Sequence, residues 1–228
     1  MMKKHFSKVT AKIRYWFVFG IIKYLTPSLY IKMKIQVIQN NAVPRPSTRL
    51  IKYYLNSELV GAEVGVDIGI NALNLLEMLN MRKLFLIDIY EESYYTDDAL
   101  IITEKSAYIK AQNRLKKYKD KIEFIIKPSV EASKDIIKPL DFVYIDANHD
   151  YKHVYEDLEA WFPLVREGGV VAGHDIIHCV GVLNAVTDWC RDHNIQFSIF
   201  PPDWYFIKSE QKITLPFNAL LGKMMNDK

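Results

Sequence analysis

The chain has 228 residues, of which 50% are apolar, 25% charged and 13% aromatic. This composition is typical of globular proteins and excludes a disordered or fibrous chain. At roughly 100–200 residues per domain, the length suits one domain with an added element at one end and excludes two full domains.

The N-terminal segment differs in charge from the rest of the chain. Residues 1–57 carry eleven Lys and Arg and no acid, so the remaining 19 bases against 27 acids leave the rest at −8, although the whole chain is at +3. Apolar residues near helical spacing predict a basic, aromatic-rich helical extension over residues 1–46 whose apolar side covers the domain. Peripheral contact with the inner membrane surface or with an acidic partner is the open alternative. Nucleic acid is a weaker partner, because no recognition motif accompanies the basic residues.

The sequence predicts neither a membrane span nor a cleaved leader. The longest apolar run near the start, residues 15–22, is well short of the roughly 20 residues that a spanning helix needs, and no small-residue cleavage site follows it. The two cysteines, Cys179 and Cys190, are too few for a disulfide framework and lie in no metal-binding spacing. We therefore expect a cytoplasmic protein in a reducing compartment.

After two prolines, Pro44 and Pro46, the pattern changes to an alternation of helices and short buried strands. This places the second domain at residues 47–228. Strands are expected over residues 60–66, 84–87, 122–126, 142–145 and 169–172, and helices over residues 72–80, 103–118, 151–162 and 181–192. Strict alternation of strand and helix implies a parallel sheet covered on both faces.

Two last apolar segments, residues 196–200 and 204–207, are separated by only three residues. This connection is too short for a helical crossover, so the pair should be antiparallel. The expected fold class is therefore α/β: a Rossmann-like, doubly wound, mainly parallel seven-stranded sheet with an antiparallel C-terminal strand.

Polar residues and glycines follow the strands at their carboxyl ends, where such sheets bind ligands. Gly65 and Gly69 follow the first strand, and Asp88 lies 19 positions after Gly69, where an acid can accept hydrogen bonds from ribose hydroxyls. A purely geometric glycine turn is the alternative for the first loop. The GxGxxG fingerprint is missing, which argues against NAD.

Two strings, AEVGVDIG and DFVYIDANHDYKHVYEDLEAWFPLVREGGVVAGHD, together with the acid after the second strand, resemble class I S-adenosylmethionine-dependent methyltransferases. The resemblance covers about residues 48–208 and is closest to the branch that includes macrocin-type sugar O-methyltransferases. Asp67 departs from the family pattern, which has a glycine or a bulky residue at that place in the loop. Pro201-Pro202-Asp203-Trp204 resembles a motif of amino-methylating nucleic-acid enzymes, but it follows the wrong strand, so we give it no role.

The resemblance implies a set of residues that contact S-adenosylmethionine. Glu63 and the two glycines would lie beside its methionine part, Asp88 at its ribose, and Ser129 with Val130 near its adenine. The full implied set is Glu63, Gly65, Val66, Gly69, Asp88, Ile89, Ser129, Val130 and Asp146.

A second constellation follows the fourth and fifth strands and consists of Asp146, His149, His174 and Asp175. Two carboxylates and two imidazoles in one crevice could hold a divalent metal such as Mg²⁺. The resemblance implies that Asp146 and Asp175 are metal ligands and that His149 is the catalytic base. His174, which stands where some relatives carry Glu, is a third ligand or orients one. A loop histidine without chemistry and a helix cap are the alternatives for His149 and Asp175.

The function that these residues predict is metal-assisted O-methylation of a hydroxyl on a sugar, a glycan or a related small molecule. A vicinal-diol or phenolic acceptor would use the same chemistry. The alternative is a non-catalytic nucleoside-binding or scaffold protein with this fold, whose basic N-terminus contacts a membrane or an acidic partner. Whether the chain forms a homo-oligomer is open.

Overall fold

A computed structural model describes residues 45–90, 104–137 and 139–209 of the chain. Most of the predicted N-terminal extension, residues 1–44, lies outside the described residues, so the extension and its boundary stay predictions. Within the described ranges, no helix is both long and apolar enough to cross a membrane.

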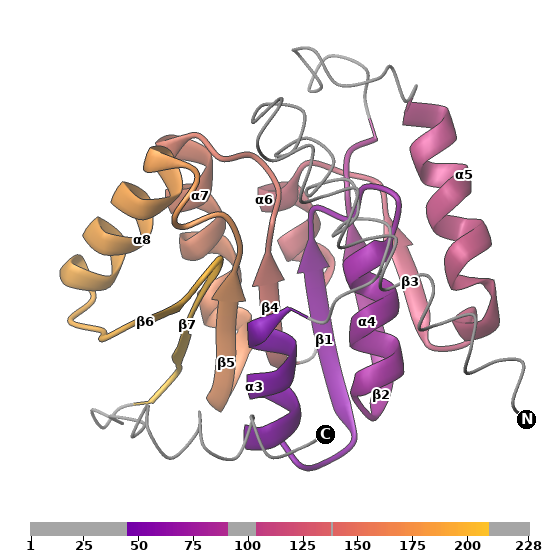
Figure 1. Cartoon of the computed structure of the whole chain (residues 1–228), viewed down its shortest axis with the longest axis horizontal. Helices are drawn as coiled ribbons and strands as arrows, with labels where there is room; N and C mark the ends of the chain where they lie inside the picture. Colours follow the sequence, from indigo (N-terminus) through magenta and orange to yellow (C-terminus); the bar gives the residue numbers. More distant parts are fainter. Residues whose placement is uncertain (1–44, 91–103, 138, 210–228) are drawn as a thin grey trace, which may run out of the picture. The chain divides into compact units, whose positions relative to one another are not determined.

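Seven strands form one sheet in the order β3-β2-β1-β4-β5-β7-β6 (Figure 1). The strands are β1 (Leu59–Val64), β2 (Met81–Ile87), β3 (Ile122–Ile125), β4 (Leu140–Ile145), β5 (Val165–Gly173), β6 (Ser198–Phe200) and β7 (Asp203–Ile207). Strands β1 to β5 pair in parallel, whereas β7 is antiparallel to both β5 and β6. The predicted fold class is confirmed. Strand order reverses between β1 and β4, which makes their carboxyl ends the place where such a sheet binds ligands.

Helices cover both faces of the sheet, as Figure 1 shows. They are α3 (Pro46–Tyr54), α4 (Ile70–Met78), α5 (Glu104–Leu115), α6 (Ser129–Ala132), α7 (Tyr151–Trp161) and α8 (Val180–Asp192). Side chains of α3, α4 and α5 form one buried cluster with the sheet, and side chains of α6, α7 and α8 form the other. All six residues of β1 are buried, because a central parallel strand has a helical layer on each side.

Strands β2 and β5 begin three and four residues earlier than their apolar pattern predicts, at Met81 and Val165, and charged residues explain both differences. Strand β2 already includes Lys83, whose ammonium lies 2.8 Å from the carboxylate of Glu123 on β3. Strand β5 includes Arg166, whose Nε donates a hydrogen bond to Asp141 on β4 at 2.7 Å. Cross-strand charge pairs extend these strands, and a search for apolar runs does not detect them.

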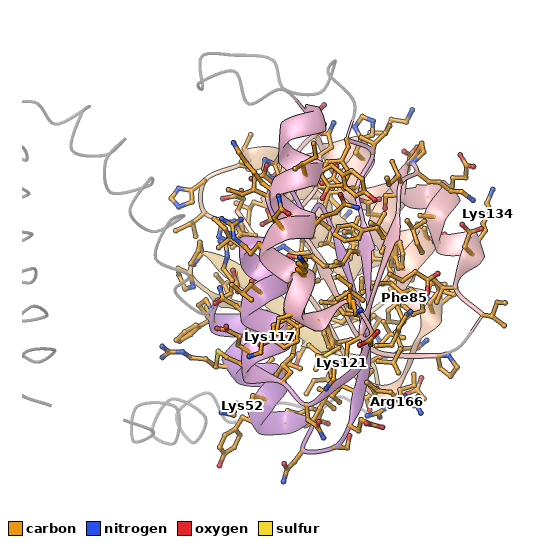
Figure 2. All side chains as sticks on the ribbon, turned by 90° about the vertical axis from the view of Figure 1, so that its right-hand side faces the viewer. Lys52, Phe85, Lys117, Lys121, Lys134 and Arg166 are labelled. Carbon is orange, nitrogen blue, oxygen red and sulfur yellow. The ribbon has the colours of Figure 1, made fainter. Side chains whose placement is uncertain are left out.

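Several basic residues lie toward the end of the described domain where the parallel strands begin. Figure 2 shows Lys52, Lys117, Lys121 and Arg166 toward this end. The loops at the carboxyl ends of the strands, at the opposite end, carry the residues singled out above.

Candidate active site

The loop after β1 packs directly against the end of β4. Gly65 and Gly69 have φ of +89° and +76°, a region that favours glycine. A Cβ on Gly65 would lie only 2.0 Å from the carbonyl oxygen of Asp146. Glycine at this position therefore brings the ends of β1 and β4 together at the reversal of strand order.

Asp88, after β2, holds this loop in place through its carboxylate. Its Oδ2 accepts hydrogen bonds from the backbone N–H groups of Val66 and Asp67, both at 2.9 Å, and its Oδ1 accepts one from Tyr90 at 2.9 Å. An ionised carboxylate has about four acceptor positions, so it can still accept a hydrogen bond from a ligand hydroxyl. Ile89 is partly exposed beside it.

Glu63 is a buried acid at the base of the same loop, with 1% of its surface exposed. Its Oε1 accepts a hydrogen bond from Asn71 at 3.0 Å, whereas its Oε2 is buried and has no hydrogen-bond partner among the described residues. Burial raises the pKa of Glu63 to about 8. Because buried polar atoms are normally paired, this unpaired carboxyl oxygen is a position where a polar group of a ligand would fit.

Ser129 and Val130 follow β3, but they face different surroundings. The Ser129 hydroxyl accepts a hydrogen bond from Nε1 of Trp161 at 2.8 Å. Burial raises the pKa of neighbouring Asp157 to about 7, although a hydrogen bond from Ser129 opposes the rise. The hydroxyl is thus committed to α7, whereas the Val130 side chain is 41% exposed. Of the two, Val130 offers the free apolar surface.

The four residues of the second constellation come together at the ends of β4 and β5. Nε2 of His149 lies 3.6 Å from Oδ1 of Asp146 and 3.3 Å from Oδ2 of Asp175. Nδ1 of His174 lies 3.7 Å from Oδ1 of Asp146 and 3.0 Å from Oδ1 of Asp175. Each imidazole therefore contacts both carboxylates.

The charged groups in this cluster shift the pKa values of His149 and Asp175 in the direction that favours their charged forms. The Asp146 carboxylate, and then that of Asp175, raises the pKa of His149 above its ordinary value, although burial opposes the rise. Burial raises the pKa of Asp175, but a hydrogen bond from His174 and the neighbouring cationic groups outweigh it, so the net shift is downward. Asp175 also has φ of +59°, unusual for a residue other than glycine, and such conformations concentrate at functional sites.

Two overlapping groups of side chains in this cluster are close enough together to hold a metal ion. Ligand atoms of Asp146, His174 and Asp175 lie within 4.8 Å of one another, and so do those of His149, Asp175 and Cys179. We did not predict Cys179 as a site residue. The sequence shows no metal-binding spacing around Cys179, and it is the turn after Asp175, closed by a hydrogen bond from the Cys179 N–H to the Asp175 carbonyl at 2.9 Å, that brings the two residues together.

Two further polar residues beside the cluster, Arg45 and Asp203, could not be identified from the sequence. Nη2 of Arg45 lies 3.5 Å from Oδ2 of Asp146. The buried carboxylate of Asp203 accepts hydrogen bonds from the Ser47 backbone at 3.0 Å, from the Ser47 hydroxyl, and from the Tyr144 hydroxyl at 3.1 Å. Asp203 also lies 3.9 Å from Nε2 of His174, although it comes from the Pro-Pro segment to which we gave no role.

Comparison with known proteins identifies the family. A family model described as a methyltransferase domain matches residues 62–176, which is half of the chain. The chain belongs to this methyltransferase family. The match spans the glycine loop, Asp88 and the carboxylate–imidazole cluster, whereas no curated protein matches the chain in sequence.

Solved structures share the fold at low sequence identity. The O-methyltransferase NovP is 16% identical, with a TM-score of 0.52 over 72% of this chain and 78% of its own. The precorrin 8w decarboxylase of Methanobacterium thermoautotrophicum is 18% identical, with a TM-score of 0.51 over 72% and 81%. An rRNA methylase of Streptococcus thermophilus is 15% identical, with a TM-score of 0.52 over 74% and 99%. These proteins are named for different reactions, so the shared fold alone does not identify the acceptor.

This methyltransferase is an enzyme of the class I, S-adenosylmethionine-dependent type. Its residues fit that cofactor on two structural observations. The orphaned Glu63 Oε2 supplies a buried acceptor for a positively charged or N–H-bearing group, and the glycine at position 65 keeps the loop free of a side chain. The acidic carboxylate of Asp88 stands at the neighbouring strand end.

Proposed function

We propose that this methyltransferase transfers a methyl group to a hydroxyl oxygen of a sugar, a glycan or a related small molecule, in the manner of the macrocin-type branch it resembles. A divalent cation at Asp146, His174 and Asp175 would assist the reaction. The observation that carries this proposal is the position of His149 at the carboxyl edge of the sheet. Its Nε2 lies 3.3 Å from the Asp175 carboxylate and 3.6 Å from the Asp146 carboxylate.

The cofactor would lie along the ends of β1, β2 and β3. Glu63, Gly65, Val66 and Gly69 would surround its methionine part, and Asp88 with Ile89 would bind its ribose. Val130 would pack on the adenine, with the Ser129 backbone beside it. Asp146, which lies against the glycine loop, would separate cofactor from acceptor.

Bound S-adenosylmethionine supplies a methyl group on a positively charged sulfur, and a bound cation supplies a positive charge that lowers the pKa of an acceptor hydroxyl. Alcohols are poor nucleophiles, so the acceptor must lose its proton as it attacks. Nε2 of His149 would take this proton, because it lies at the carboxyl edge of the sheet beside the proposed metal ligands Asp146 and Asp175. The two carboxylates beside it would stabilise the imidazolium that forms.

The basic N-terminal extension, residues 1–46, is proposed to contact phosphate groups of a nucleotide-linked or lipid-linked acceptor. It carries nine Lys and Arg and no acid. Such contacts would explain why a chain whose remainder is acidic carries so basic a segment.

The experiment that tests this function is methyl transfer from labelled S-adenosylmethionine to a panel of acceptors in the presence of divalent cations. The panel contains free sugars, nucleotide-linked sugars, catechols, amines and RNA. We expect label in a hydroxyl acceptor, with nucleotide-linked sugars favoured over the free sugars. Label that appears only in amines or RNA would contradict the proposal.

A further inference from the structure

We propose that the cation of this site is a first-row transition-metal ion of the Zn²⁺ or Fe²⁺ type rather than Mg²⁺, held by Asp146, His174 and Asp175. This inference rests on the cation-assisted function proposed above and specifies its metal.

The donor atoms are the first argument. Mg²⁺ binds almost entirely through oxygen and keeps several water ligands, whereas an imidazole nitrogen is a preferred ligand of Zn²⁺ and Fe²⁺. Only two of the three donors here are carboxylates, and the third is Nδ1 of His174. The overlapping group also contains an imidazole, together with the Cys179 thiol, a soft ligand that Mg²⁺ does not favour. Neither group of described residues is an all-oxygen site.

The spacing of the donors is the second argument. Ligands that lie about 2.0–2.2 Å from a tetrahedral ion are about 3.3–3.6 Å from one another. Nδ1 of His174 is 3.0 Å from Asp175 and 3.7 Å from Asp146, which brackets this separation. The three residues also come from two adjacent strand ends, so the sheet fixes their positions before an ion arrives.

The surroundings of His174 are the third argument. Its side chain is only 12% exposed, and its Nε2 lies 3.9 Å from Oδ1 of the buried Asp203. Metal-binding histidines normally direct their second ring nitrogen toward a carboxylate, which orients the ring and makes it a better ligand. Asp203 is fixed in turn by hydrogen bonds from Ser47 and Tyr144. Asp203 thus lies beside the second ring nitrogen of His174 but does not accept a hydrogen bond from it, and Nε2 has no hydrogen-bond partner among the described residues.

The test is a calorimetric titration of the full-length protein, freed of metal, with Zn²⁺ alone and with Mg²⁺ alone. We expect Zn²⁺ to bind more tightly than Mg²⁺. His174→Ala should weaken Zn²⁺ binding by at least the roughly 10–100-fold that is typical of losing even a supporting partner of a ligand. His153→Gln is the matched control, because this partly exposed imidazole on α7 belongs to neither group and its replacement should leave Zn²⁺ binding unchanged.

A second variant keeps the test decisive if His174→Ala fails to fold. In His174→Asp, a carboxylate oxygen is as many bonds from Cα as Nδ1 was, so the site becomes all-oxygen. We expect this variant to gain affinity for Mg²⁺ and lose affinity for Zn²⁺. Mg²⁺ binding equal to or tighter than Zn²⁺ binding in the unmodified protein, or Zn²⁺ binding that survives His174→Ala, would overturn the inference.

The acceptor assay separates this inference from the proposed function. Hydroxyl methylation that proceeds with Mg²⁺, in a protein that shows no preference for Zn²⁺, would remove the inference and leave the function intact. Tight, His174-dependent Zn²⁺ binding without methylation of any hydroxyl would support the inference and contradict the function.

Discussion

His149→Ala lowers the rate of methyl transfer by roughly 10²–10⁴-fold, the range for loss of a general base, while the protein still binds S-adenosylmethionine. The expectation follows from the position of Nε2 between Asp146 and Asp175, where an imidazolium would be stabilised. The side chain is 40% exposed, so its removal leaves no large core cavity. Initial rates at saturating cofactor and acceptor, together with calorimetric titration of the cofactor, measure the two effects separately.

The matched control for this variant is His153→Ala. His153 lies on α7, four residues after His149 in the preceding loop, is partly exposed and lies 3.8 Å from the Asp150 carboxylate. Its loss removes an imidazole and an ion pair without touching the carboxylate–imidazole cluster, so the rate should stay within about twofold of the unmodified enzyme. A comparable rate in His149→Ala and His153→Ala would remove the base assignment.

Gly65→Ala abolishes cofactor binding and lowers the free energy of unfolding by roughly 2–4 kcal/mol, because it combines backbone strain with a steric clash. The new Cβ would lie 2.0 Å from the Asp146 carbonyl oxygen and 2.7 Å from the Ala147 backbone nitrogen. Both neighbours are backbone atoms, so the ends of β1 and β4 must separate to make room. Denaturant unfolding and cofactor titration measure these two effects.

Gly168→Ala separates the strain from the clash. Gly168 has φ of +71°, close to that of Gly65, but the nearest atom to its Cβ is a side-chain nitrogen of Arg166 at 3.4 Å. We expect this variant to lose about 1–2 kcal/mol from strain alone and to bind the cofactor normally. If the two variants lost the same stability and bound the cofactor equally well, the close approach of the glycine loop to β4 would not be essential to the site.

The fold follows from the sequence because apolar strands and amphipathic helices alternate along the chain. The antiparallel end of the sheet was also predictable, since the three residues between its last two strands leave no room for a crossover helix. The starts of β2 and β5 were not predictable, because Lys83 and Arg166 interrupt the apolar pattern. Their charges are paired only with acids on neighbouring strands.

Part of the candidate site was predictable from the sequence and part was not. Asp146, His149, His174 and Asp175 follow strands that the pattern identifies, so topology alone predicts that they meet. Arg45 and Asp203 were not predictable, because they reach the cluster only through the packing of α3 and β7 beside it. The commitment of the Ser129 hydroxyl to Trp161 likewise depends on side-chain packing between α6 and α7, which no local pattern encodes.

Calorimetric titration of the full-length protein with S-adenosylmethionine and with its demethylated product tests the account most directly. We expect both to bind at one saturable site, and Asp88→Ala to weaken binding by roughly tenfold or more, equivalent to about 1.4 kcal/mol. Asp135→Ala, which removes an exposed carboxylate paired with Lys127, should leave binding unchanged. No binding of either compound, or binding that is indifferent to Asp88→Ala, would contradict the assignment of the cofactor site to the carboxyl edge of β1 and β2.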